Sequence, residues 1–289
     1  MLWGGYMMGL SGTRVFITGA GSGIGYQIAL AFARNGANVI VSDIDMAGLE
    51  KLAAEPVLQS VELAKKELDV RDIDAYRALI QELVDADTIP DIVVNNAGLG
   101  VFRKFTDTSL EDWKLTLDVN VMGVVHGCKL FSEVWLARKM SGHIVNLSSM
   151  ASLAPIPNMS AYVASKMAVE GLSDVLNMEY SDKGIFVTCV HPGIIDTPIM
   201  RHDERYGFSP ERVTRIQKYY REKGVLPRVV AEDVVKAVTR KSATLITGTD
   251  VLKVIIGRKI LPRKAFLKLV TRQARKIGFL PRKDTRNHE

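Results

Sequence analysis

The sequence has little cysteine, and its two cysteines do not suit a disulfide scaffold. Cys128 lies in a helix-like segment and Cys189 in a strand-like segment, both in apolar surroundings, which is typical of core thiols. The five histidines show no metal-ligand spacing, so we predict no metal site. There is also no internal repeat, low-complexity tract or linker rich in proline and serine to divide the 289 residues.

Long apolar runs are missing as well. No stretch reaches the roughly 18 apolar residues that a membrane-spanning helix needs. Residues 1–8 lack a charged start and a full apolar core, so we do not interpret them as a signal peptide. We therefore expect a cytoplasmic protein.

A glycine-rich turn is the first informative feature that is present. It follows a short buried strand expected at Val15–Thr18 and precedes a helix whose apolar positions begin at Ile28. Its residues include Gly19, Ser22, Gly23, Ile24 and Gly25. Glycines allow a tight turn and a close approach to a pyrophosphate, which the free N–H groups of the helix start can bind. The spacing differs from the general Gly-x-Gly-x-x-Gly fingerprint, but a second strand ends in Asp43, where an acid can bind an adenosine ribose. This arrangement predicts a nucleotide site.

A tyrosine and a lysine are spaced four residues apart in a helix-like segment. Tyr162 and Lys166 would therefore lie on one helix face. An ammonium group near a phenol favours the phenolate, which can exchange a proton with an alcohol or ketone oxygen. Taken alone, the pair could equally be a surface tyrosine stacked on a lysine stem. The other motifs of the chain favour catalysis.

With these motifs in order, the chain resembles a short-chain dehydrogenase/reductase of the classical type over roughly residues 9–200. The motifs that carry the resemblance are Thr18–Gly25, Asn95–Gly98, Asn120, Ser149, Tyr162 with Lys166, and His191–Pro198. The resemblance implies that Ser149 binds the substrate oxygen, that Tyr162 is the general acid or base, and that Lys166 binds the nicotinamide ribose and lowers the pKa of the tyrosine. It also implies that Asn120 holds a proton-relaying water. We expect the neighbouring Ser148 to be structural.

Cofactor contacts also follow from the resemblance. They are expected from Gly19, Ser22, Gly23, Ile24, Gly25, Asp43, Asp69, Val70, Asn96, Ala97, Gly98, Tyr162, Lys166, Pro192, Gly193, Ile195 and Thr197. For Asp69 two interpretations stay open, an adenine contact and an ordinary helix cap. Because Asp43 would repel the 2′-phosphate of NADP and no lysine or arginine lies nearby to offset it, we predict NAD as the cofactor.

Alternating strand-like and helical segments predict the fold. We expect an α/β protein with a Rossmann-type, doubly wound parallel sheet in three α/β/α layers. One catalytic domain would span residues 9–252, with a substrate loop at about 198–226 and a basic amphipathic extension at 253–289. A sixth helix and a seventh strand are expected at 231–240 and 244–247.

The resemblance implies that two segments flank the site, and in this chain both carry apolar side chains, which indicates a hydrophobic secondary alcohol or its ketone as substrate. These side chains are Leu153, Ile156, Met159, Ile199, Met200, Tyr206 and Phe208. Steroids, retinoids, terpenoids and long-acyl alcohols would all suit such a pocket. The alternatives are an NADP-dependent ketoreductase, a nucleotide sensor without catalysis, and a nucleotide-gated adaptor that acts through the basic extension.

The basic residues are concentrated at the end of the chain. Residues 253–289 contain 12 Lys/Arg and 2 Asp/Glu, whereas residues 1–252 have a net charge of −4. The extension could lie on an anionic membrane, pack on the domain or cap a neighbouring subunit; we favour packing and predict no nucleic-acid partner. From the resemblance, we expect a dimer or tetramer formed through helices at 110–138 and 161–182.

Overall fold

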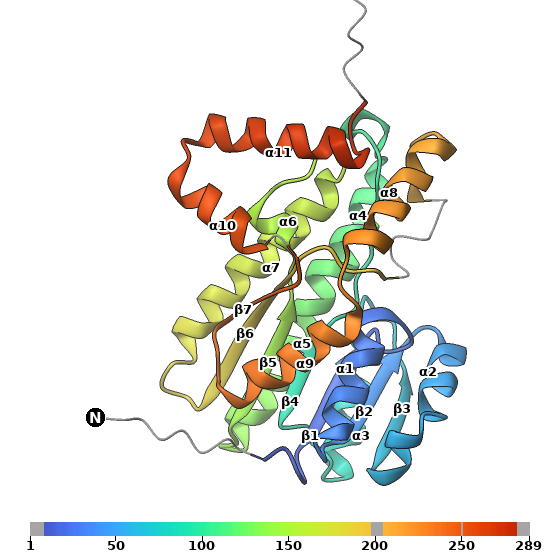
Figure 1. The fold of residues 1–289 in the computed structure, drawn as a ribbon. Coiled ribbons are helices and arrows are strands. Elements are labelled where there is room, and N and C mark those ends of the chain that lie inside the picture. Colours follow the sequence, from blue (N-terminus) through green and yellow to red (C-terminus); the bar gives the residue numbers. More distant parts are fainter. Residues whose placement is uncertain (1–8, 198–204, 250, 282–289) are drawn as a thin grey trace, which may run out of the picture.

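The computed structural model describes residues 9–197, 205–249 and 251–281. Its described residues form one sheet of seven parallel strands in the order β3-β2-β1-β4-β5-β6-β7 (Figure 1). The strands are β1 Arg14–Thr18, β2 Asn38–Asp43, β3 Leu63–Glu67, β4 Ile92–Asn95, β5 Gly142–Leu147, β6 Ile185–Pro192 and β7 Thr244–Thr247. The strand order reverses between β1 and β4, as in a doubly wound sheet. The predicted Rossmann-type fold is confirmed.

Helices cover both faces of this sheet. They are α1 Gly23–Arg34, α2 Met46–Ala53, α3 Ile73–Asp85, α4 Leu110–Leu117, α5 Gly123–Ala137, α6 Met150–Leu153, α7 Ser160–Glu179, α8 Pro210–Lys223, α9 Pro227–Thr239, α10 Val251–Ile260 and α11 Arg263–Ile277. One core packs side chains of α1, α2 and α9 against the sheet. A second core packs α3, α5 and α7 against the opposite face. Both cores are dominated by fully buried aliphatic side chains, which supply the main stabilising free energy of such a sandwich.

Strand β3 was not predicted from the sequence, because its residues do not have the apolar pattern of a buried strand. Its residues are half-buried or exposed at the edge of the sheet. Lys65 forms an ion pair with Glu50, and Lys66 with Glu82. Charged side chains are a common feature of edge strands, because they discourage pairing with another chain. A pattern of alternating or continuous apolar residues therefore does not find this strand.

The helix expected at 110–138 contains an irregular turn. A π-helical turn at Asp118–Met122 joins α4 to α5. Asn120 lies in this turn and is fully buried. Single π-turns inside helices occur often at functional sites, since the extra residue redirects a side chain.

The C-terminal extension folds back over the domain. Helices α10 and α11 cross the end of the molecule where α6 and α8 lie, shown at the top of Figure 1. Phe266 and Ala274 of α11 are buried, and so is Phe279 beyond its end. The inner face of the extension therefore packs on its own chain. The division of the chain at residue 252 stays a prediction, although α10 begins near it, at Val251.

Candidate active site

A pocket of about 740 Å³ opens at the carboxyl ends of the parallel strands, where ligands of doubly wound folds bind. It is lined on one side by residues expected to contact the cofactor: Gly19, Ser22, Gly23, Ile24, Asp43, Asp69, Val70, Asn96, Ala97, Gly98, Pro192, Gly193, Ile195 and Thr197. Ser149, Tyr162 and Lys166 line the same pocket. Of the catalytic and cofactor-binding residues expected from the sequence, Gly25 and Asn120 lie outside this lining.

The glycine turn is shaped by backbone contacts that leave no room for side chains. Gly19 has φ 67°, and a Cβ added there would lie 2.7 Å from the Cα of Ala97. A Cβ on Gly25 would lie 2.3 Å from the carbonyl oxygen of Gly19. The side-chain amide of Asn96 donates to the carbonyl oxygens of Thr18 and Gly19, at 3.0 and 2.9 Å. Gly25 therefore packs directly against the backbone of the turn. The turn forms a cradle suited to a pyrophosphate.

Asp43 is held at the end of β2 by two backbone donors. Its Oδ2 accepts a hydrogen bond from the N–H of Gly21 at 2.8 Å, and its Oδ1 accepts one from the N–H of Asp45 at 3.0 Å. These bonds fix the carboxylate at the pocket wall beside the glycine turn. A carboxylate has about four acceptor positions, so the two ribose hydroxyls of a dinucleotide can still be bound.

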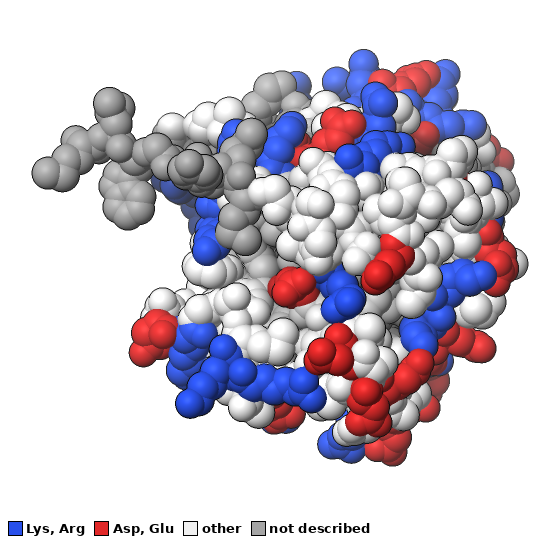
Figure 2. Space-filling view, turned by 90° about the horizontal axis from the view of Figure 1, so that it is seen from below, with Lys and Arg blue, Asp and Glu red and all other residues white. Residues whose placement is uncertain are grey.

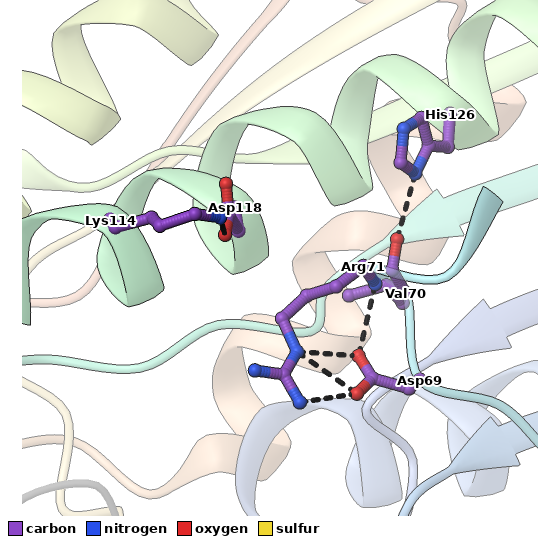
Figure 3. A network of polar contacts seen from close by, with 6 residues as sticks. All are labelled: Asp69, Val70, Arg71, Lys114, Asp118 and His126. Carbon is purple, nitrogen blue, oxygen red and sulfur yellow. Dashed lines mark hydrogen bonds and ion pairs between the residues drawn. The ribbon is translucent and has the colours of Figure 1, made fainter. Parts of the chain in front are cut away.

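Asp69 pairs with Arg71 and does not cap a helix. Both Asp69 oxygens accept hydrogen bonds from the Arg71 guanidinium (Figure 3). These bonds lower the pKa of Asp69 more than its partial burial raises it. The cap of α3 is Asp72, which accepts from the N–H groups of Asp74 and Ala75. Of the two interpretations left open for Asp69, the structure therefore removes the helix cap.

Val70, the next residue of the pocket wall, is anchored through its backbone. Its carbonyl oxygen accepts a hydrogen bond from Nδ1 of His126, at 2.9 Å (Figure 3). His126 belongs to α5, so this bond ties the pocket wall at Val70 to a helix of the second core. Gly123 of the same helix also packs closely on Val70, since a Cβ added to Gly123 would lie 2.7 Å from the Val70 side chain.

Ser149, Tyr162 and Lys166 come together from two helix starts. Ser149 is the N-cap of α6, and its Oγ accepts a hydrogen bond from the N–H of Ala151 at 3.1 Å. Tyr162 and Lys166 lie one turn apart in α7. The Lys166 Nζ lies 5.7 Å from the centroid of the Tyr162 ring and donates to the carbonyl oxygen of Leu147 at 2.7 Å. The neighbouring Ser148 donates to the carbonyl oxygen of Lys166, a structural bond that ties β5 to α7.

Burial dominates the electrostatics of these groups. It raises the pKa of the Tyr162 phenol, while a hydrogen bond with Ser149 acts in the opposite direction. It lowers the pKa of Lys166 to about 8. The physical cause is the same in both cases, because a low-dielectric site disfavours the charged form. The net shift of the Tyr162 pKa is therefore upward, whereas the sequence led us to expect a lowered value.

Asn120 supports the site from behind. Its Oδ1 accepts from the N–H of Leu99 at 2.8 Å, and its Nδ2 donates to the carbonyl oxygen of Leu99 and to Oγ of Ser165. Its partners lie on a loop and on α7, not on its own helix. It links the loop after β4 to the helix that carries Tyr162 and Lys166.

The far side of the pocket is apolar, and the sequence identified only part of it. Ile156 and Met159 line it as expected, together with Phe102 and Tyr220, which sequence reasoning missed. Leu153 is not part of the lining, whereas Ile199 and Met200 lie outside the described residues. Phe102 lies four residues after the Asn95–Gly98 motif and Tyr220 lies far from every motif, and no spacing rule marked either of them. Arg205, also missed, adds a cation at the same side.

Tyr206 and Phe208 form a second layer behind this wall. The ring of Tyr206 stacks on that of Phe102, with the centroids 4.5 Å apart. Phe279 from the C-terminal extension lies on the same cluster, 6.4 Å from Phe102 between ring centroids. The extension therefore supports the apolar end of the pocket, which its basic composition did not indicate.

Comparison with known proteins agrees with this geometry. A family model described as short chain dehydrogenase matches residues 13–206. The chain belongs to the short-chain dehydrogenase family. The solved structure of a short-chain dehydrogenase/reductase from Burkholderia phymatum in complex with NAD superposes with a TM-score of 0.79 and 25% identity, covering 91% of this chain and 96% of the other. The glycine cradle and the fixed Asp43 carboxylate fit a nicotinamide dinucleotide.

Two curated relatives extend the comparison. The probable oxidoreductase EphD of Mycobacterium tuberculosis (strain H37Rv) is 41% identical over 235 residues, which cover 79% of this short-chain dehydrogenase but 40% of EphD. The chain thus spans less than half the length of that relative. Cyclohexanol dehydrogenase from Acinetobacter sp. (strain SE19) is 37% identical over 189 residues, covering 65% of this chain and 75% of that enzyme.

Proposed function

We propose that the protein is an NAD-dependent oxidoreductase that interconverts a hydrophobic secondary alcohol and its ketone. The observation that carries this proposal is the meeting of Ser149, Tyr162 and Lys166 in a pocket with a dinucleotide cradle at one end and an apolar wall at the other. When bound, the nicotinamide supplies the hydride acceptor or donor. The protein binds and orients the substrate and moves the proton.

Tyr162 is the acid/base of this proposal. Burial raises the pKa of the phenol, which favours the protonated form that donates to a ketone oxygen. In the direction of alcohol oxidation the phenolate must form, and the ammonium group of Lys166 on the same helix face would stabilise it. Ser149, already in contact with the phenol, would hold the substrate oxygen. Asn120 positions α7 through Ser165 and would hold the relay water.

NAD is the preferred cofactor in this proposal because of Asp43. The carboxylate is fixed by backbone donors at the pocket wall and would lie against the 2′-phosphate of NADP. No lysine or arginine occurs in the glycine turn or at positions 42–45 to offset that repulsion. Solved structures of the same fold contain NAD or NADP, so the alternative is an NADP-dependent ketoreductase. Titration of the protein with both cofactors decides between them, and tighter binding of NADP would contradict the proposal.

The decisive test is the substitution Tyr162→Phe. Turnover of a panel of apolar secondary alcohols, followed by the absorbance of NADH, should fall by ~100-fold or more, because positioned proton transfer contributes at least that much. NAD affinity should stay near that of the wild type, since the phenol hydroxyl acts on the reacting oxygen. Lys166→Ala should reduce both turnover and NAD affinity.

Tyr180→Phe is the matched control, because Tyr180 directly follows the same helix and lies outside the pocket. It should leave both quantities unchanged. More than about a tenth of wild-type turnover in Tyr162→Phe would reject the acid/base role. Binding of NAD without turnover of any alcohol or ketone by the wild type would instead favour the nucleotide-gated adaptor.

Subunit association is part of the same proposal. Exposed apolar side chains are found on the helices expected to pair, including Leu110 at 81% and Met178 at 69% exposure. Pairing through α7 would stiffen the helix that carries Tyr162 and Lys166. Light scattering should give a dimer or tetramer, and a mass near 31.9 kDa at micromolar concentration would contradict it.

A further inference from the structure

The outer surface of helices α10 and α11 carries charge of one sign. Residues 251–281 contain nine Lys/Arg and no Asp/Glu. In α11, Lys264, Lys268 and Arg272 follow one another at intervals of four, and all three are exposed. Residues four apart form a row along one helix face. These three side chains therefore make a basic row along α11.

The opposite side of α11 is already occupied by the protein itself. Phe266 packs beside Gly257 of α10, and Ala274 belongs to the apolar cluster behind the substrate pocket. Gln273 donates a hydrogen bond to the hydroxyl of Tyr219 in α8, at 3.3 Å. Packing on the domain thus fixes the helix with its basic row outward. Packing and an outward-facing binding surface are compatible, although the sequence presented them as alternatives.

Helix α10 adds an exposed apolar stripe to the extension. Leu252, Ile256 and Ile260 are again spaced by four, with exposures of 66%, 48% and 73%. Leu269 of α11 is 53% exposed. The turn at Leu261 and Pro262 joins the two helices at the same end of the molecule (Figure 1). Aliphatic side chains beside lysines and arginines, with no acid among them, are typical of helices that lie on an anionic membrane surface.

The opposite end of the molecule has a different surface. The view from below Figure 1 shows Lys/Arg and Asp/Glu interspersed (Figure 2). Many of the described lysines elsewhere in the chain have acidic partners, such as Lys129 with Glu133 and Lys218 with Glu222. The single-sign charge is therefore a local property of α10 and α11.

We propose that α10 and α11 form a docking surface for anionic lipid bilayers. The basic row would bind lipid phosphates and the α10 stripe would enter the boundary between headgroups and acyl chains. A nucleic acid fits less well, since it gains little from exposed aliphatic side chains and would stack on aromatic ones, whereas Phe266 and Phe279 are buried. Among the described residues no helix is long and apolar enough to cross a bilayer. The proposal is independent of the proposed catalytic function.

Co-sedimentation of the full chain with vesicles tests the docking surface. The wild type should bind vesicles of phosphatidylcholine with phosphatidylglycerol, bind pure phosphatidylcholine much more weakly, and be released by salt. The triple variant K264Q/K268Q/R272Q should lose on the order of 100-fold in affinity, from about 1 kcal/mol for each cation near the surface. Its NAD affinity should not change, because these residues lie outside the pocket.

A second triple variant controls for net charge. R34Q/K51Q/K139Q removes three exposed cations from other parts of the chain and should bind anionic vesicles as the wild type does. The variant I256S/I260S should lose the part of the binding that survives high salt. Equal loss in both triple variants, no binding of the wild type to anionic vesicles, or stronger binding to duplex DNA than to vesicles at one ionic strength would overturn the proposal.

Discussion

The two ends of the pocket are built in different ways. The cofactor end is made by strand ends and turns whose shape is fixed by backbone atoms, as where Asn96 bonds to the carbonyl oxygens of Thr18 and Gly19. The substrate end is made by side chains brought from distant parts of the sequence, as where Phe279 packs near Phe102. The cofactor end is local and tightly constrained, whereas the substrate end depends on the C-terminal extension packing behind its wall.

The two ends of the pocket should differ in how well they tolerate amino-acid substitutions. Backbone geometry admits few residue types, so substitutions at the cofactor end should be costly. Apolar packing admits many residues of similar volume, so the substrate end can change its shape while the sheet stays intact. In such an arrangement one cofactor site can serve different apolar substrates.

The largest effect is expected at the glycine turn. Gly25→Ala would place a Cβ 2.3 Å from the carbonyl oxygen of Gly19, a backbone atom that cannot move without opening the turn. We expect a loss of about 3 kcal/mol or more in unfolding free energy, the upper range for overpacking, and a large loss of NAD affinity. Denaturant unfolding and NAD titration measure the two effects.

Gly9→Ala is the matched control, since Gly9 has nothing within 4 Å of an added Cβ. It should stay within about 0.5 kcal/mol of the wild type. A stable Gly25→Ala variant with normal NAD affinity would show that the turn is not constrained as described.

A smaller and local effect is expected at the extension. Phe279 is fully buried, and its replacement by alanine should cost about 3 kcal/mol, at the low end for a buried phenylalanine. We expect this change to lower the free energy of local opening of the extension. Hydrogen exchange of α11 amides should therefore accelerate by about 100-fold. Leu269→Ala removes a half-exposed side chain of α11 and should change little. Unaltered exchange in Phe279→Ala would contradict the proposed anchor.

The smallest effect concerns one hydrogen bond. Asn158 has φ 63° and donates from its side chain to the carbonyl oxygen of Phe279. Asn158→Gly keeps the backbone conformation and loses the bond, which should cost about 1 kcal/mol. Asn158→Ala loses the bond and also strains the left-handed backbone, adding about 1–2 kcal/mol. Thermal unfolding of both variants would separate the cost of the lost hydrogen bond from the cost of backbone strain. Equal stability of the two variants would mean that the backbone conformation relaxes.

The sequence predicted which residues meet at the cofactor end of the pocket because the information there is local. A glycine turn after a strand, an acid at the end of β2 and the Tyr162–Lys166 spacing each predict geometry within a few residues. The residues concerned line one pocket, apart from Gly25 and Asn120. Fold class followed from the alternation of strands and helices. Only the edge strand β3 was missed, since its half-exposed charged residues do not resemble a core strand.

The substrate end was predicted less completely because its contacts join distant segments. No spacing rule connects Phe102 with Tyr220 or with Phe279. The pKa of Tyr162 also depends on tertiary structure, because burial raises it more than the hydrogen bond with Ser149 lowers it. The sequence showed that the extension is basic and amphipathic. It did not show that its apolar face packs against α8, because that contact joins distant segments.

A crossed measurement of two variants tests the central claim that the two ends are separate. The Kd for NAD and the KM for a bulky apolar alcohol should be determined for Asp43→Ala and for Phe279→Ala. We predict that Asp43→Ala weakens NAD binding by tenfold or more, about the 1.4 kcal/mol of a lost charge-assisted hydrogen bond, with KM little changed at saturating NAD. Phe279→Ala should raise KM and leave the Kd for NAD unchanged. If each variant altered both constants to the same extent, the two ends would form one coupled unit and the account would be wrong.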